Sequence, residues 1–274
     1  MMELAIVEGM MSMKKIVASL TGASLLAVSV IWLSGGWPVW PKQDETHTPP
    51  PPVADKPEPL QFTFENTTRI DGDGRQIVTN PDHMLVLVNK QRNLPADFLP
   101  TDMVAPQVPF PFTANEPRRF LRAEAASALE QLFAAAQANG LRPYALSGFR
   151  AFERQYAIFA AQVERVGEGE ANRTVARAGQ SEHQTGLAMD ITSREVGFAL
   201  TVDFGVTPEG KWLAANAHRF GFIVRYPAGK EHITGYSYEP WHIRYVGTAV
   251  AEYLFAHSLT LEEYFQQKYG FGLD

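Results

Sequence analysis

Residues 16–33 form an uncharged apolar run that is long enough to cross a lipid bilayer as a single helix. Lys14 and Lys15 stand directly before this run, and the next charged residue is Lys42. Basic residues collect on the cytoplasmic side of a membrane helix, so this asymmetry predicts a cytoplasmic amino end. We therefore interpret residues 1–37 as an N-terminal signal or anchor segment that attaches the chain to the cytoplasmic membrane.

A cleaved signal peptide is the alternative interpretation of the same run. Its apolar core would be shorter, and two small residues should mark a cleavage site just after it. Ala27 and Ser29 lie inside the run instead, and no clear site follows Leu33. We therefore expect a single-pass protein of the cell membrane with its folded part outside the cell, and keep secretion after cleavage as the alternative.

Residues 38–59 are rich in proline and include consecutive prolines at positions 49–52. Proline-rich segments adopt extended, stiff conformations and act as spacers between a membrane and a folded domain. Beyond residue 60 the pattern becomes globular, without a second linker or an internal repeat. We predict a linker over residues 38–59 and one folded domain over residues 60–274.

The composition of the chain excludes several classes of protein. Its net charge of −6 argues against a nucleic-acid partner, which normally requires a basic face. The absence of cysteine excludes a disulfide scaffold, a thiolate zinc site and a cysteine nucleophile. Hydrophobic residues make up 45% of the chain and charged residues 20%, as is typical of a globular domain. We expect this domain to be a monomer.

Strands and helices alternate irregularly along the predicted domain. Short runs of β-branched and aromatic residues predict strands at residues 61–68, 75–78, 144–146, 187–192, 222–225 and 241–246. Apolar residues at helical spacing predict helices at residues 116–138, 151–166 and 208–220, followed by two closing helices. Because there is no regular strand–helix–strand rhythm, we expect the α+β class, with a central antiparallel sheet flanked by helices.

Three short segments contain the residues best suited to catalysis. They are SGFR at residues 147–150, SEHQTGLAMD at residues 181–190 and EPWHIRYVG at residues 239–247. Within them, His183, Asp190 and His242 would supply two imidazoles and a carboxylate. A catalytic zinc ion uses three such nitrogen and oxygen ligands and leaves one position open. Gly186 permits a tight bend, so the chain could fold back and bring His183 beside Asp190.

Two charged residues near these ligands suit the chemistry of peptide hydrolysis. Glu239 lies three residues before His242, and the intervening Pro240 disfavours regular sheet pairing there. A carboxylate placed beside a metal, without binding it, can take a proton from water and return it to a leaving amine. Arg150 follows a glycine-containing turn and could hold a substrate carboxylate or a developing oxyanion.

Taken together, the three segments resemble the zinc D-alanyl-D-alanine carboxypeptidases of the VanY type. This family is grouped with lysostaphin, the D-Ala-D-Ala dipeptidases and the metal-binding domain of hedgehog signalling proteins. The family pattern SGYR, SxHxxGxAxD and ExWHxRYVG occurs here in the same order, over roughly residues 84–257. Phe149 replaces the usual tyrosine, so this chain lacks the hydroxyl that the family has at this position.

The resemblance implies a role for each matching position. The implied zinc ligands are His183, Asp190 and His242. Glu239 would be the catalytic base, and Arg150 would serve the substrate or the transition state. Gln155 and Ser181 would lie near the peptide and contribute to substrate binding.

The expected function is zinc-dependent removal of the terminal D-alanine from peptidoglycan stem peptides. An L,D-carboxypeptidase acting on tetrapeptide stems, or a dipeptidase, would use the same residues. A non-catalytic, zinc-stabilised wall-binding module is an alternative from a different class, but a structural zinc ion needs neither Glu239 nor Arg150. A serine D,D-peptidase is disfavoured, because the Ser-x-x-Lys run at residues 12–15 precedes the folded domain.

Overall fold

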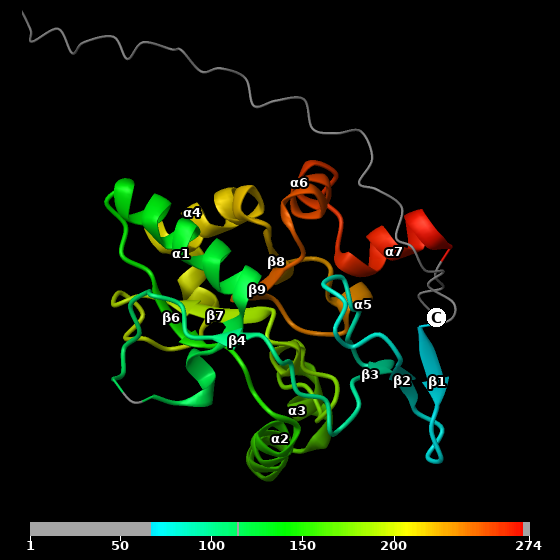
Figure 1. Cartoon of the computed structure of the whole chain (residues 1–274). Helices are drawn as coiled ribbons and strands as arrows, with labels where there is room; N and C mark the ends of the chain where they lie inside the picture. The colour runs from blue at the N-terminus through cyan, green and yellow to red at the C-terminus, as the bar shows by residue number, and fades with distance from the viewer. Residues whose placement is uncertain (1–66, 114, 271–274) are drawn as a thin grey trace, which may run out of the picture. The chain divides into compact units, whose positions relative to one another are not determined.

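The computed structural model describes residues 67–113 and 115–270 (Figure 1). The expected anchor and linker lie outside these residues, as does most of the strand expected at 61–68. Within the described part of the chain, no helix is long and apolar enough to cross a membrane.

A four-stranded antiparallel sheet forms the centre of the domain, as the sequence predicted. Its strand order is β6 (Tyr144–Ser147), β7 (Ala188–Thr192), β9 (Glu239–Tyr245) and β8 (Phe222–Tyr226). Each neighbouring pair is antiparallel. β7 has a neighbour on both edges and every one of its residues is buried, so residues on this strand occupy fixed positions in the interior.

Helices cover the two sides of this sheet (Figure 1). On one side lie α1 (Ala123–Ala138), α4 (Pro208–Asn216) and α6 (Thr248–Ala256). The apolar face of α1 packs against the sheet and shares one core cluster with Met189 and Ile243. Burial of these apolar side chains holds the sheet in place against the helices.

A second core cluster joins α6 and the last helix, α7 (Leu261–Tyr269), to strand β8. α7 begins with a capping box. Glu263 N donates to Thr260 Oγ1 at 3.2 Å, and Thr260 N donates to Glu263 Oε2 at 2.7 Å. Tyr264 and Phe265 of this helix are buried and pack in this cluster.

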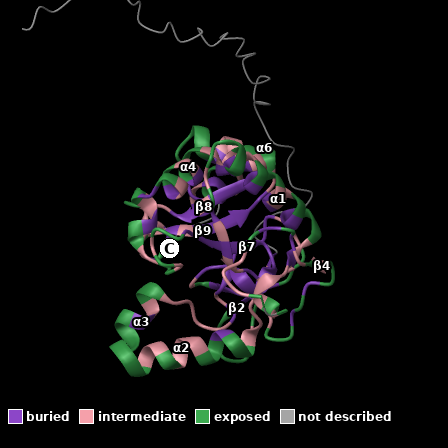
Figure 2. Cartoon of the chain, turned by 90° about the vertical axis from the view of Figure 1, so that its left-hand side faces the viewer, coloured by how far each residue is buried: buried purple, intermediate pink, exposed green. Residues whose placement is uncertain are grey.

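Two helices form an arm on the other side of the sheet. α2 (Phe152–Val166) confirms the helix expected at 151–166, and α3 (Glu168–Thr174) follows it directly. Both helices are largely exposed, as Figure 2 shows, and Gln155 is the buried residue of α2. We call this pair of helices the α2–α3 arm. It faces the region of the sheet that contains the functional residues.

Shorter elements complete the described part of the chain. The small sheets consist of β1 (Thr68–Ile70), β2 (Gln76–Val78) and β3 (Arg92–Asn93), and of β4 (Met103–Val104) and β5 (Leu121–Arg122). The short helices are η2 (Pro117–Arg119), η3 (Glu182–Thr185), η4 (Val202–Val206), η5 (Ala217–Phe220) and α5 (Glu231–Thr234).

The structure corrects two boundaries that were predicted from local pattern. The helix expected at 116–138 begins only at Ala123, because the preceding residues pair with β4 as strand β5. The helix expected at 208–220 ends as an α-helix at Asn216 and continues as the 3₁₀ turn η5 up to Gly221. Pairing partners far away in the sequence override the local helical pattern in the first case.

Candidate active site

Sheet pairing and a tight turn bring the three expected metal ligands together. Asp190 on β7 and His242 on β9 are direct partners in the antiparallel register. His183 belongs to η3, which ends at Gly186 with a φ of 67°. This left-handed conformation suits glycine and turns the chain back into β7, as the sequence predicted. All three side chains are buried.

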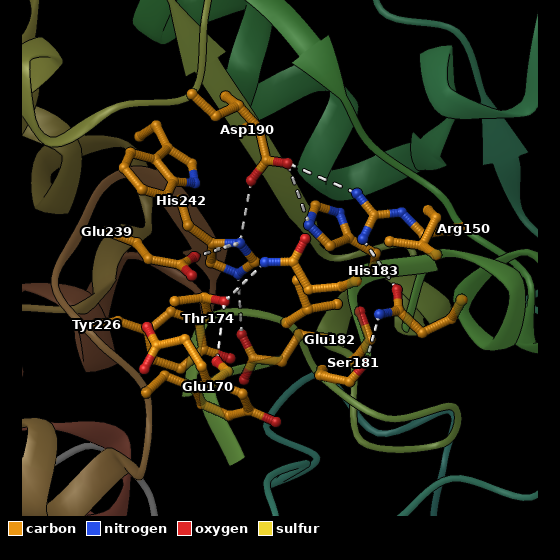
Figure 3. Close-up of a pocket in the computed structure, with 18 of the residues that line it drawn as sticks. Arg150, Glu170, Thr174, Ser181, Glu182, His183, Asp190, Tyr226, Glu239 and His242 are labelled. Atoms are coloured by element: carbon orange, nitrogen blue, oxygen red, sulfur yellow. Dashed lines mark hydrogen bonds and ion pairs between the residues drawn. The ribbon is translucent and has the colours of Figure 1, made fainter. Parts of the chain in front are cut away.

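The ligand atoms of this group face one another at distances that suit a metal ion. His242 Nδ1 lies 3.1 Å from Asp190 Oδ1, and His183 Nε2 lies 3.4 Å from Asp190 Oδ2 (Figure 3). One such atom from each residue lies within 4.8 Å of the other two. Tetrahedral zinc with bonds of about 2.0–2.1 Å separates neighbouring ligand atoms by about 3.4 Å. Two imidazoles and a carboxylate in this arrangement therefore fit zinc.

Hydrogen bonding decides which nitrogen of His183 is available to a metal. His183 Nδ1 lies 2.8 Å from the carbonyl oxygen of Gly148. A carbonyl can only accept a hydrogen bond, so Nδ1 is the protonated nitrogen and Nε2 carries the free lone pair. The backbone at Gly148 is tightly packed, because an added Cβ would lie 2.5 Å from the carbonyl oxygen of Phe120.

Burial and close partners shift the pKa values of the ligand residues. Burial lowers the pKa of His183, which favours the neutral imidazole that a metal requires. Burial raises the pKa of Asp190, but the two facing histidines outweigh this effect and hold it below its usual value. Burial lowers the pKa of His242, yet the facing carboxylates of Asp190 and Glu182 outweigh it and raise the pKa to about 9. A metal ion must displace a proton from this group.

Glu239 lies beside the ligand group, at the start of β9. Its Oε2 is 3.9 Å from His242 Nδ1, and its carboxylate points toward the ligands in Figure 3. Burial raises the pKa of Glu239 to about 7; His242 opposes this effect, and Asp190 adds to it. A carboxyl group with a pKa near neutrality can exchange a proton at physiological pH, which is what a general base requires. As expected for Pro240, the sheet pairing is irregular here, because Glu239 pairs with Tyr226 only after a register shift between Val224 and Tyr226.

Arg150 lies on the opposite side of Asp190 and is held by hydrogen bonds. Its Nη2 lies 3.8 Å from Asp190 Oδ2 and donates to Ser147 Oγ at 3.0 Å. Its Nη1 donates to Gln155 Oε1 at 2.9 Å, and Gln155 Nε2 donates to the carbonyl oxygen of Ala176 at 2.6 Å. Gln155 thus positions the guanidinium group instead of projecting freely toward a substrate. This fixed fork suits binding of a carboxylate or an oxyanion.

All seven residues singled out from the sequence line one pocket: Arg150, Gln155, Ser181, His183, Asp190, Glu239 and His242. The pocket has a volume of about 530 Å³, within the range of about 300–1,000 Å³ that is usual for ligand sites. It lies between the central sheet and the α2–α3 arm, and Gln162 and Thr174 of that arm are among its lining residues. This space is larger than the ligand group alone needs and can receive a peptide.

A set of buried charged residues beside His242 was not predicted from the sequence. Glu182, Arg225 and Arg244 are fully buried and joined by ion pairs. A signal was present in the sequence, because Arg225 interrupts an apolar strand and Arg244 lies between the apolar residues Ile243 and Tyr245. A buried arginine requires an acidic partner, so this pattern predicts buried carboxylates near both strands.

Known proteins resemble this chain in both sequence and fold. A family model described as VanY, D-alanyl-D-alanine carboxypeptidase, matches residues 118–248. The putative carboxypeptidase YodJ of Bacillus subtilis is 50% identical over 195 residues, which are 71% of each chain. A D-alanyl-D-alanine carboxypeptidase of Enterococcus faecalis is 34% identical over 264 residues, or 88% of each chain.

Two solved structures extend this likeness to three dimensions. The LdcB LD-carboxypeptidase has a TM-score of 0.70 and 48% identity, over 75% of this chain and 96% of that one. A vancomycin-resistance D,D-pentapeptidase VanY variant in complex with Zn(II) has a TM-score of 0.53 and 35% identity, over 66% and 98%. By its sequence and by its fold, this chain belongs to the VanY family of D-alanyl-D-alanine carboxypeptidases.

Proposed function

We propose that this chain is a zinc carboxypeptidase that removes the terminal D-alanine from peptidoglycan stem peptides. The observation that carries the proposal is the buried group of His183, Asp190 and His242 with Glu239 beside it. Glu239 Oε2 lies 3.9 Å from a ligand nitrogen, close enough to act on the same reacting atoms. The named activities of the relatives support the same reaction class.

The residues of the pocket have different roles in peptide hydrolysis. Zinc, when bound by the three ligands, supplies a Lewis acid for a carbonyl oxygen and lowers the pKa of water. The Glu239 carboxylate accepts a proton from the attacking water and passes it to the nitrogen of the leaving D-alanine. Burial raises the pKa of this carboxylate to about 7, so near neutral pH it can both accept and release a proton.

Arg150 supplies the positive charge of the pocket beside the ligands. Its guanidinium is fixed by Ser147 and Gln155, so little conformational freedom is lost when it binds an anion. It would hold either the terminal carboxylate of the peptide or the oxyanion that forms during attack. Ser181 lines the same pocket and is a further candidate for contact with the peptide.

The L,D-carboxypeptidase activity is a second candidate, because LdcB is an LD-carboxypeptidase with 48% identity to this chain. Both reactions release D-alanine and differ in the residue that precedes it. The pentapeptide stem ends in D-Ala-D-Ala, whereas the tetrapeptide stem presents an L-residue before the terminal D-alanine. The catalytic residues would therefore be the same for both substrates.

Release of D-alanine from the two stem peptides separates these candidates. The zinc-loaded full-length chain is incubated with pentapeptide or tetrapeptide, with Glu239→Gln and a chelator as controls. D-alanine from pentapeptide that is lost in both controls supports the D,D activity. Release only from tetrapeptide would assign the L,D activity, and zinc binding without either cleavage would favour the wall-binding module.

We further propose that residues 16–33 hold the domain on the outer side of the cytoplasmic membrane. The uncharged apolar run, its basic flank and the proline-rich spacer support this location. The full-length chain should fractionate with membranes, resist extraction by salt and be released by detergent. Recovery in the soluble fraction with its amino end intact would contradict the anchor, and recovery of a shortened chain would indicate cleavage.

A further inference from the structure

We propose that helix α7, near the carboxyl end, is part of the zinc site, because a buried chain of charges connects it to His242. This inference rests on the zinc site of the proposed function. In it, Glu262 on α7 fixes Arg225, Arg225 fixes Glu182, and Glu182 orients the imidazole of His242. These are positioning residues that present Nδ1 of His242 to the metal.

The chain of charges ends at the side of His242 that faces away from Asp190. His242 Nε2 lies 3.6 Å from Glu182 Oε2 (Figure 3). Both atoms are buried, and neither has a hydrogen-bond partner among the residues that the structure describes. Buried polar atoms are nearly always paired, so a shift of a few tenths of an ångström that joins these two satisfies both. A carboxylate can only accept a hydrogen bond, so the proton then belongs to Nε2 and Nδ1 keeps its lone pair.

Glu182 is held in place through its other oxygen. Oε1 accepts a hydrogen bond from Arg225 Nε at 2.8 Å and one from Arg244 Nη1 at 2.7 Å. Arg244 is itself anchored, because its Nη2 donates to the carbonyl oxygens of Met84 and Val86. With Oε1 occupied by two guanidinium groups, Oε2 is the oxygen left for His242.

The connection to α7 is a two-point contact. Arg225 Nη1 donates to Glu262 Oε2 at 2.8 Å, and Arg225 Nη2 donates to Glu262 Oε1 at 2.6 Å. Paired contacts of this kind fix the plane of the guanidinium as well as its position. Removal of Glu262 therefore frees Arg225 to rotate away from Glu182.

The charges in this group balance, and none of them is exposed. The side chains of Arg225, Arg244 and Glu182 are 0% exposed and that of Glu262 is 1% exposed. Two arginines thus neutralise two glutamates, so loss of one member leaves an uncompensated buried charge. Glu262 lies beyond residue 248, where the match to the family model ends, so the motifs that identify the zinc ligands do not include this part of the site.

The test compares zinc affinity in two neighbouring variants of the full-length chain. Glu262→Gln keeps the side-chain volume and removes the charge that holds Arg225. Glu263→Gln is the matched control, because Glu263 caps the same helix and pairs with Lys230 near the surface. The zinc dissociation constant is measured by competition with a chromophoric chelator, and thermal unfolding of the metal-free protein reports stability.

We expect Glu262→Gln to weaken zinc binding on the order of tenfold, the lower end of the effect of residues that support metal ligands. Glu263→Gln should lower the unfolding temperature and leave zinc affinity unchanged. Equal zinc affinity in wild type and Glu262→Gln would overturn the inference, as would equal weakening by both variants, which would indicate general destabilisation.

A charge-balanced variant keeps the test decisive if Glu262→Gln does not fold. Replacing Arg225 and Glu262 together by methionine removes the connection without leaving either charge unpaired. We expect this double variant to fold and to bind zinc more weakly than wild type, and unchanged affinity would contradict the inference. Because zinc affinity is measured directly, a wild-type chain that binds zinc but releases no D-alanine would refute the proposed function alone.

Discussion

Asp190 and His242 face each other across neighbouring strands, with Oδ1 of the aspartate 3.1 Å from Nδ1 of the histidine. Their separation follows from the antiparallel register of β7 and β9, in which the two residues are direct partners. Two of the three ligands are therefore set by the central sheet, and the turn at Gly186 adds the third. A site on paired strands holds its geometry better than one on loops alone.

Replacement of Asp190 should separate metal binding from folding. Asp190→Asn keeps the shape of the side chain but removes the anionic ligand between the two histidines. We expect zinc affinity to fall at least about 100-fold, because this change removes a direct ligand whereas changes to its supporting residues cost about 10–100-fold. Met189→Leu, on the same strand but within the apolar core, is the matched control and should bind zinc normally.

If Glu239 is the general base, its replacement should abolish turnover without releasing the metal. Glu239→Gln retains the volume of the side chain and cannot accept the proton of the attacking water. We expect kcat to fall by about 10²–10⁴, the usual contribution of a general base, while the zinc content stays that of wild type. Glu170 lines the same pocket with an exposed carboxylate that contacts none of the ligand residues, so Glu170→Gln should leave kcat unchanged.

The raised pKa of Glu239 also predicts how the metal-free protein responds to pH. Its pKa in the folded chain is about 7, above the usual value of 4.5. The folded state therefore binds the proton more tightly, and ionisation destabilises it. This cost is absent below pH 4.5, grows as the pH rises toward 7 and is constant above that value.

Glu239→Gln removes this cost and should stabilise the metal-free protein. Above pH 7, we expect the free energy of unfolding of the variant to exceed that of wild type by on the order of 1–3 kcal/mol. Near pH 4, the two proteins should be equally stable. Chemical denaturation at both pH values, in the presence of a chelator, measures the difference. If the variant were equally less stable than wild type at both pH values, burial of the ionised Glu239 would not destabilise the folded protein.

The close packing of Gly148 predicts that one methyl group there disturbs the metal site. An added Cβ would lie 2.5 Å from the carbonyl oxygen of Phe120, which forces the backbone to move. The carbonyl of Gly148 orients His183, so Gly148→Ala should lower both stability and zinc affinity. Gly169→Ala is the control, because a Cβ there meets nothing within 4 Å, and it should bind zinc as wild type does.

The sequence predicted which residues meet at the candidate site, because each lies in a short segment whose residue types suit zinc binding or proton transfer. It also predicted the antiparallel sheet, since strand patterns and turns are local signals. The predicted start of α1 was wrong because Leu121 pairs with Val104, a contact that no local pattern reveals. The support behind His242 was missed for the same reason, since Glu182 and Arg225 are 43 residues apart.

A zinc-edge anomalous difference map from a crystal of the zinc-loaded chain shows directly where the metal binds and which atoms hold it. We expect one strong peak within about 2.0–2.2 Å of His183 Nε2, His242 Nδ1 and a carboxylate oxygen of Asp190. Glu239 should lie nearby without bonding to the metal. The proposed zinc site would be wrong if the metal bound Nε2 of His242, if Glu239 were among its ligands, or if no peak lay in this pocket.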